Sequence, residues 1–522
     1  MLNFYYGFVL LSVYKSVYYF AYNGFKIIFV IIFYDYIALF AYCDILIYRF
    51  LITLNFQSVI MNGGIIVRNI FKKAVCLLSA LAVCIPTAAM SAGAVEDKNY
   101  IIGNPYAEVD WDTWSSYKTQ LHCHTNASDG ASTIADTVEA YYAADYDILA
   151  LTDHMTLGVQ WDQKPEVVSL MRLIKYQRTG FKELVPLTSE RREEILNGVG
   201  RDGRPMLEVT TGVELNGAVP QNSHINGYFS DYGQGLIGID GDYETPAAEV
   251  GKRGGITFVD HIGDYTHAGD ENDPTISQQD EYVRKYSRIF LDNPSCVGTG
   301  INSAKDLQTK WDRVIYDEIL QKTVPYGVVP WSFSFSDSHS DTIDQIDRAF
   351  TVHLMKEFSV TDLRRSMEEG TFFAICRYAR AELGDDYEGV GAVPSVSRIT
   401  VDEREDTIQI DATNYDRVVW VANGVEIAEG AKIDLDDYSD DISCYVRAYL
   451  VGPGAVCYVQ PFTVNVEGET LEKEEIAPVH NYSYYLRLLI TFLDNYIFSQ
   501  DSIVRKCWNW LASDWGVTIP NW

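Results

Sequence analysis

The sequence has few cysteines and no closely spaced pairs, which excludes a disulfide-dense fold. Nine cysteines are spread over 522 residues, and no C-x-x-C pair occurs. Six of the nine follow residue 94: Cys123, Cys296, Cys376, Cys444, Cys457 and Cys507. Cys444 and Cys457 are the one pair that could bridge neighbouring strands, and we favour free thiols there.

Cationic residues are also scarce. The chain has 41 Lys and Arg residues against 72 Asp and Glu residues, and its formal net charge is −31. This balance excludes a broad basic surface for extended nucleic acid. We therefore expect the positive charge of any anion-binding site to come from bound metal.

Charged residues are nearly absent from residues 1–60, which taken literally predict one or two membrane helices. However, Met61 opens a better targeting signal, because Arg68, Lys72 and Lys73 precede an apolar run and the A-x-A site Ala92–Ala94. We predict translation from Met61, with residues 1–60 an upstream hydrophobic segment, and residues 61–94 a signal peptide cleaved near Ala94. A lipoprotein signal at Cys84 is the weaker alternative. The mature protein is then exported, to the periplasm, the cell surface or the medium.

Histidine is rare, yet six of the nine histidines lie at or beside predicted strands, mostly at their C-terminal ends. The stretch LHCHTNASDG opens the series with His122 and His124, which project to one face of an extended chain. The others are His154, His224, His261 and His339, and the carboxylates Asp129, Glu214 and Asp337 are placed similarly. Any one of these histidines alone is typical of a structural residue. Together they predict a metal centre of mixed imidazole and carboxylate ligands.

The strands that carry these residues alternate with helical or loop intervals. They are predicted at 147–151, 206–215, 223–229, 254–263, 295–302, 327–340, 348–355 and 371–379, with helices near 133–146 and 306–320. This order favours an α/β barrel over an all-β domain, and barrel enzymes keep their chemistry at the C-terminal ends of the strands.

These motifs resemble those of the PHP (polymerase and histidinol phosphatase) domain family over residues 115–380. HCHTNASDG resembles the first motif, TDH (152–154) the second, the Glu214–His224 region and His261 the middle motifs, and SDSHS (336–340) the last. The resemblance implies a distorted (β/α)7 TIM-like barrel over residues 95–394, with up to three metal ions at the strand ends.

The resemblance also implies how the ligands are shared. One metal is expected on His122, His124, Glu214 and Asp337, and a second on Glu214, His224 and His261. A third is expected on Asp129, His154 and His339.

The expected chemistry is attack on a phosphoryl group by a hydroxide that bridges the metals, which are Zn, Mn or Fe. We predict that His339 or Asp153 assists with proton transfer. Arg377 and Arg380, at the end of a predicted strand, are candidate phosphate contacts. A long basic insertion, residues 155–205, is expected to be a solvated helical excursion. The alternative is a basic lid over an anionic substrate.

After residue 394 short alternating strands predict a small β-sandwich-like domain over residues 395–467. A linker and two apolar segments, 484–498 and 501–515, predict a C-terminal helical hairpin within residues 468–522. Membrane contact is expected only through the signal or these helices.

The function that these features predict is an exported, metal-dependent phosphoesterase acting on a small phosphorylated substrate. The alternatives are an exonuclease-like phosphodiesterase of oligonucleotides or nucleotides, and a non-catalytic, metal-stabilised binding protein.

Overall fold

The computed structural model divides the chain into two compact units, Met1–Ala94 and Val95–Trp522. It describes residues 98–216 apart from 170–171, 173–174, 177–179 and 181. It also describes 224–233, 244–262, 280–303, 311–477 apart from 380–382, 385 and 388, and residue 489. The predicted signal peptide, the segment before it and the C-terminal hairpin lie outside these residues.

The described part of the second unit is a mixed α/β fold. Its strands up to residue 376 are β1 (Tyr100–Gly103), β2 (Ser115–Gln120), β3 (Ile148–Ala150), β4 (Leu207–Val209), β5 (Val213–Asn216), β6 (His224–Tyr228), β7 (Ile256–Val259), β8 (Cys296–Ser303), β9 (Trp331–Phe335), β10 (Ala349–Met355) and β11 (Phe372–Cys376). The later strands are β12 (Ser395–Asp402), β13 (Thr407–Thr413), β14 (Arg417–Ala422), β15 (Val425–Glu429), β16 (Lys432–Asp434), β17 (Tyr445–Val451), β18 (Val456–Tyr458) and β19 (Phe462–Val466).

Seven α-helices accompany them in the described residues: α4 (Ile134–Ala143), α6 (Ser189–Leu196), α7 (Glu244–Lys252), α8 (Asp280–Asp292), α10 (Trp311–Thr323), α11 (Ile343–Ile346) and α12 (Val360–Glu369). Helix α4 begins where the sequence predicts, because Thr133 accepts a hydrogen bond from the Asp136 N–H at 3.1 Å and so caps the helix. Short 3₁₀ helices occur at Val324–Tyr326 and Asp436–Tyr438.

The described strands form three sheets. An eleven-stranded sheet runs in the order β1-β19-β17-β18-β11-β10-β2-β3-β4, with β14 and β15 joined through β17. A five-stranded sheet runs β5-β6-β7-β8-β9, and a three-stranded sheet runs β12-β13-β16. The mixed α/β class is confirmed, but the described strands do not close into one barrel.

The observed sheets differ from the expected barrel at the segment 206–215, which was predicted as one strand. The structure has two strands there, β4 and β5. Strand β4 pairs in parallel with β3, whereas β5 pairs antiparallel with β6 in the other sheet. Between them the chain passes close to the end of β3, where a Cβ on Gly212 would meet the Leu151 carbonyl oxygen at 3.0 Å. Two isolated bridges, Cys123↔Ser338 and His154↔Glu214, connect the two large sheets.

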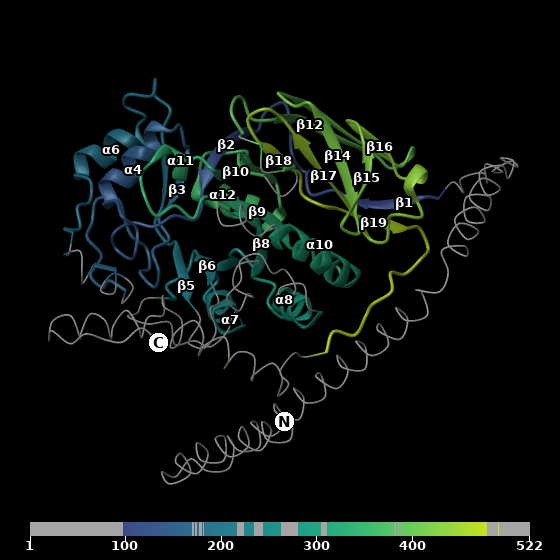
Figure 1. Ribbon diagram of the computed structural model, residues 1–522, viewed down its shortest axis with the longest axis horizontal. Helices are drawn as coiled ribbons and strands as arrows, with labels where there is room; N and C mark the ends of the chain where they lie inside the picture. The colour runs from purple at the N-terminus through teal and green to yellow at the C-terminus, as the bar shows by residue number, and fades with distance from the viewer. Residues whose placement is uncertain are drawn as a thin grey trace, which may run out of the picture. The chain divides into compact units, whose positions relative to one another are not determined.

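Of the strands after residue 394, β14, β15, β17, β18 and β19 belong to the eleven-stranded sheet, whereas β12, β13 and β16 form the three-stranded sheet. Strand β18 pairs antiparallel with β11, Ile375 lying opposite Cys457. The buried side chains of Trp420 and Val446 belong to the same hydrophobic cluster as Tyr141 and Leu149. Figure 1 shows these strands gathered beside β1, with α4, α6 and α11 at the other end of the fold. Residues 395–467 therefore pack as an extension of the preceding fold.

The cysteines in the described residues are free and buried, Cys444 and Cys457 included, so the bridge considered between them does not form. Each helix of the described residues is too short or too polar to span a bilayer.

Candidate metal centre

All nine predicted ligands gather where strands of the two large sheets end. His122 and His124 follow β2, and His154 follows β3. Glu214 and His224 belong to β5 and β6, while His261, Asp337 and His339 follow β7 and β9. One isolated bridge pairs His154 with Glu214, and the other pairs Cys123, between His122 and His124, with Ser338, between Asp337 and His339, so the bridges hold both sheets at this point.

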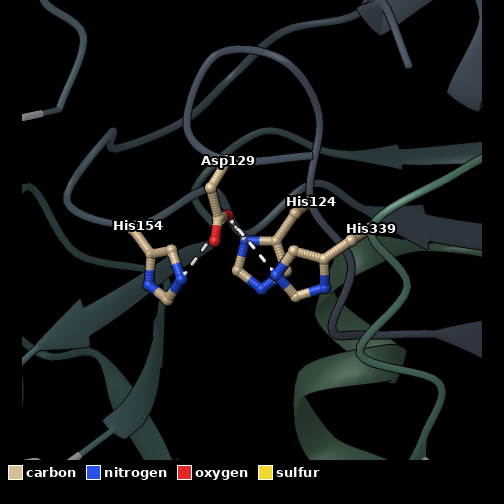
Figure 2. A group of neighbouring side chains, drawn as sticks. All are labelled: His124, Asp129, His154 and His339. Carbon is tan, nitrogen blue, oxygen red and sulfur yellow. Dashed lines mark ion pairs between the residues drawn. The ribbon is translucent and has the colours of Figure 1, made fainter. Parts of the chain in front are cut away.

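Asp129 lies among three imidazoles (Figure 2). Its Oδ1 is 3.6 Å from Nε2 of His154, 3.4 Å from Nε2 of His339 and 3.7 Å from Nδ1 of His124. This group unites the three ligands expected for one metal and adds His124.

Glu214 lies at the centre of the remaining ligands. Its carboxylate oxygens are 2.5 Å from Nδ1 of His224, 2.7 Å from Nδ1 of His154 and 3.3 Å from Nε2 of His124. Nitrogens of His122 and His261 lie at 3.7 and 3.8 Å. Glu214 is thus within 4 Å of five histidines, which is the arrangement expected of a bridging ligand.

The structure distributes the other ligands differently from the expected sharing. Besides the Asp129 group, the side chains close enough to hold one ion are three sets: His122, His124 and Glu214; His122, His261 and Asp337; and His154, Glu214 and His224. His154 therefore joins two sets, and His261 lies with Asp337 more than with His224. These neighbours lie on different strands, so sequence order alone does not determine the sets.

The side chains fit divalent ions. Two ligands held about 2.1 Å from one ion at tetrahedral angles lie about 3.4 Å apart. The Asp337 Oδ1 atom is 3.3 Å from Nε2 of His122 and 3.1 Å from Nε2 of His124, which agrees with that spacing. Within the described residues, Nε2 of His122 and both Glu214 oxygens also lack a hydrogen bond of normal geometry, although all three atoms are buried. Buried polar atoms without such bonds are costly unless another partner, such as a cation, is bound.

The electrostatics of the metal-free protein are those of a tightly coupled group. Burial raises the pKa of Glu214, but His154 and His224 outweigh it and hold that pKa well below its usual range. Burial opposes protonation of His154, yet Glu214 and Asp129 raise its pKa to about 10. Burial and the neighbouring His339 and His154 lower the pKa of His124 to about 4. Cations that replaced these protons would meet carboxylates that are already ionised.

Several residues that orient the ligands were missed by sequence reasoning. Asn216 contacts Nδ1 of His154 through Oδ1 at 3.0 Å and Nε2 of His224 through Nδ2 at 2.7 Å. The Thr152 hydroxyl lies 2.9 Å from Nδ1 of His122. Such partners fix the orientation of a ligating imidazole. Their one sequence signal is that they lie one or two residues from a ligand.

Asp153 shapes the loop of the first motif. Its Oδ1 accepts hydrogen bonds from the backbone N–H groups of Thr125 and Ser128, both at 2.9 Å, and from the Ser128 hydroxyl at 2.6 Å. Its Oδ2 accepts from the Thr125 hydroxyl at 2.8 Å. Asp153 is fully buried with both oxygens in use, which argues against the proton-transfer role predicted for it.

The structure also argues against the predicted phosphate contact by Arg377. Its guanidinium binds Asp347 at 2.9 Å and the carbonyl oxygens of Gly391 and Gly454 at 3.2 and 2.9 Å. An arginine held in this way joins the segment around Asp347 to the loop that precedes β18. Arg380 lies outside the described residues.

The basic insertion uses most of its described arginines within the fold. Arg191 binds Glu139, and Arg192 binds Glu208 at 2.7 Å. Arg172 donates to the carbonyl oxygens of Asn126 and Lys182. These pairs favour a structural role for the insertion, which supports the loop that carries Asp129.

Exposure differs across the centre. The side chains of His122, His261, Glu214 and Asp337 are at most 2% exposed, whereas those of Asp129 and His339 are 18% and 32% exposed. The Asp129 group is therefore the most exposed edge of the centre.

Comparison with protein-family models and with curated proteins finds no match for this chain. Solved structures do match. One is a two-domain protein from Bacteroides vulgatus that contains a predicted PHP-like metal-dependent phosphoesterase, at 16% identity and a TM-score of 0.35, covering 72% of this chain and 94% of that one. Another is PsfC from Pseudomonas syringae, at 15% identity and a TM-score of 0.29, covering 49% and 88%. A third is a lesion-specific endonuclease from Pyrococcus furiosus, at 10% identity and a TM-score of 0.27, covering 49% and 56%.

The TM-scores of these matches lie between 0.27 and 0.35, so the function proposed below is argued from the geometry of the site. The solved structures that match this chain include one with a predicted PHP-like metal-dependent phosphoesterase, and this chain has several largely buried sets of histidine, glutamate and aspartate side chains that could hold metal ions.

Proposed function

We propose that this protein is a metal-dependent phosphoesterase that hydrolyses small phosphate esters. The observation that carries the proposal is the convergence of four overlapping sets of histidine and carboxylate side chains around Glu214. A mononuclear structural site needs one such set, whereas overlapping sets suit two or three adjacent ions. Divalent ions bound there would neutralise the charge of a phosphate and supply a nucleophile from water at neutral pH.

The proposed role of each residue depends on how deeply it is buried. The deep ligands, Glu214, His122 and Asp337, would hold the ions away from bulk water. His339 is the most exposed of the nine, with 32% of its side chain exposed, and we propose that it exchanges a proton with the leaving group when its imidazole does not hold an ion.

The substrate is proposed to be small because the described surroundings of the site offer no cationic track for a long anion. The described arginines of the insertion are paired with acids or backbone oxygens, and the net charge of −31 repels extended nucleic acid. Export after cleavage near Ala94 remains part of the proposal and is supported by the signal-like sequence before Val95.

The test uses protein that begins at Val95, since Val95–Trp522 is a compact unit. Bound metal is measured by elemental analysis, and hydrolysis of an aryl phosphate and of its diester is measured beside it. The variants are His124→Ala and Asp337→Ala, with Asp347→Ala as a matched control outside the site. We expect about two to three Zn, Mn or Fe ions per chain, and loss of hydrolysis in the two site variants only.

Less than one ion per chain and no hydrolysis would refute the proposal. Full metal content without hydrolysis of either ester would instead favour the metal-stabilised binding protein. Activity on the diester alone would favour a phosphodiesterase.

A further inference from the structure

Asp260 is a buried carboxylate beside the metal centre that the ligand sets do not include. It follows β7 directly and precedes His261, and its side chain is fully buried. Its N–H donates to the carbonyl oxygen of His224 at 3.2 Å, so it continues the β6–β7 pairing by one residue.

The register places Asp260 on the face of the sheet that carries the ligands. Asp260 lies opposite His224, and Asn226 lies opposite Glu214 on the neighbouring strand. Opposed residues in an antiparallel pair, and residues two apart on one strand, share a face. Glu214, His224, Asn226 and Asp260 therefore project to the same side.

Only one oxygen of Asp260 has a hydrogen bond within the described residues. Its Oδ1 accepts from Nδ2 of Asn226 at 2.7 Å, while Oδ2 is buried without a hydrogen-bond partner there. Among the described residues, Asp260 forms no ion pair, and the nearby imidazoles of His122 and His261 instead face Glu214 and Asp337. A buried carboxylate in this condition is strongly unfavourable unless a cation compensates it.

The charges that influence Asp260 most belong to the metal centre. They are the imidazole of His122 and the carboxylates of Glu214 and Asp337. Glu214, Asp260 and Asp337 are thus three buried carboxylates whose negative charges are costly unless nearby positive charge compensates them. Bound divalent ions would supply it.

We infer that Asp260, held in place by Asn226, is an outer carboxylate of the metal centre that strengthens cation binding by the set of His122, His261 and Asp337. It acts as a positioning and charge-balancing residue beyond the nine ligands. The inference rests on the proposed metal centre. Groups that surround ligands in this way commonly change metal affinity about 10- to 100-fold.

The experiment compares wild type with Asp260→Asn, which keeps the shape of the side chain and an oxygen to accept from Asn226. Asp317→Asn is the matched control, because Asp317 is also a buried carboxylate but binds Arg447 away from the centre. Each protein is stripped of metal, titrated with Zn²⁺ against a competing chelator, and melted with and without Zn²⁺.

Two opposite changes are expected in Asp260→Asn. The metal-free form melts at a higher temperature than wild type, because an uncompensated buried carboxylate is gone. Its weakest-bound Zn²⁺ dissociates with a Kd about 10- to 100-fold higher, and the Zn²⁺-induced rise in Tm shrinks. Asp317→Asn lowers the Tm of both forms and leaves the Zn²⁺ affinity unchanged.

An unchanged Zn²⁺ affinity in Asp260→Asn would overturn the inference while leaving the metal centre intact. Wild type that binds no Zn²⁺ would overturn the proposed function as well. If Asp260→Asn does not fold, Asn226→Ala tests the same point, because it releases the carboxylate and should also weaken Zn²⁺ binding.

Discussion

The pair of Asp317 and Arg447 provides the sharpest test of how the later strands are attached. Asp317 is on α10 and Arg447 is on β17, and their side chains are 5% and 1% exposed. Arg447 donates through Nε and Nη2 to the two Asp317 oxygens at 2.8 and 2.6 Å, and the Tyr445 hydroxyl donates to one of them at 2.8 Å.

Replacing Asp317 with Asn leaves the guanidinium buried without its counter-charge. Removing one partner of a buried ion pair costs about 3–5 kcal/mol, against a total unfolding free energy of about 5–15 kcal/mol for a domain. With an m-value of about 2–3 kcal/mol/M, the urea midpoint should fall by about 1–2.5 M. We expect this in urea unfolding followed by both fluorescence and circular dichroism.

The unfolding transitions measured by fluorescence and by circular dichroism should also coincide, because strands within residues 395–467 share a sheet and a core with the preceding fold. The double variant Asp317→Leu with Arg447→Met is the control, and it should recover most of the loss because neither charge remains. A loss below about 1 kcal/mol, or a separate early transition of the later strands, would refute the reasoning.

Three further predictions concern the site and the core. Glu214→Gln should lower the bound metal by at least one ion per chain in elemental analysis, since the Glu214 carboxylate lies within 4 Å of five histidines. Full metal content in this variant would show that Glu214 does not bridge two ions. Asn216→Ala should weaken Zn²⁺ binding about 10- to 100-fold with little change in metal-free Tm, because it frees the imidazoles of His154 and His224; an unchanged Kd contradicts this. His353, fully buried, has its pKa lowered from 6.5 to about 3 by burial. Between those values the unfolded chain binds the proton and the native protein does not, so stability falls as pH falls below about 6.5. Relative to His353→Phe, wild type should lose about 2 kcal/mol more between pH 7 and pH 5 in urea unfolding, and parallel losses would exclude this group as the cause.

The local pattern of the sequence was enough to predict the nine side chains that the structure brings together. Histidines are few, and every predicted ligand except Asp129 is at or just beyond a strand, where parallel or neighbouring strands bring their ends together. The cap of α4 at Thr133 and the strand β10 were predictable for the same reason, because capping and alternation are local properties.

The tertiary structure decided what depends on non-local contacts. Strands β4 and β5 are separate because β4 pairs with β3 and β5 pairs with β6, and these pairings are non-local contacts that no spacing encodes. The partners of Arg377 come from Asp347 and from loops far along the chain.

The sequence by itself determined which side chains could bind metal and that a mixed α/β fold carries them. Only the tertiary structure decided which ligands share an ion, that Asp153 is fully used by its own loop, and that Asp260 lies buried beside the centre. The physical reason is that ligand type is a property of one residue, whereas charge balance and burial are properties of all the residues around it.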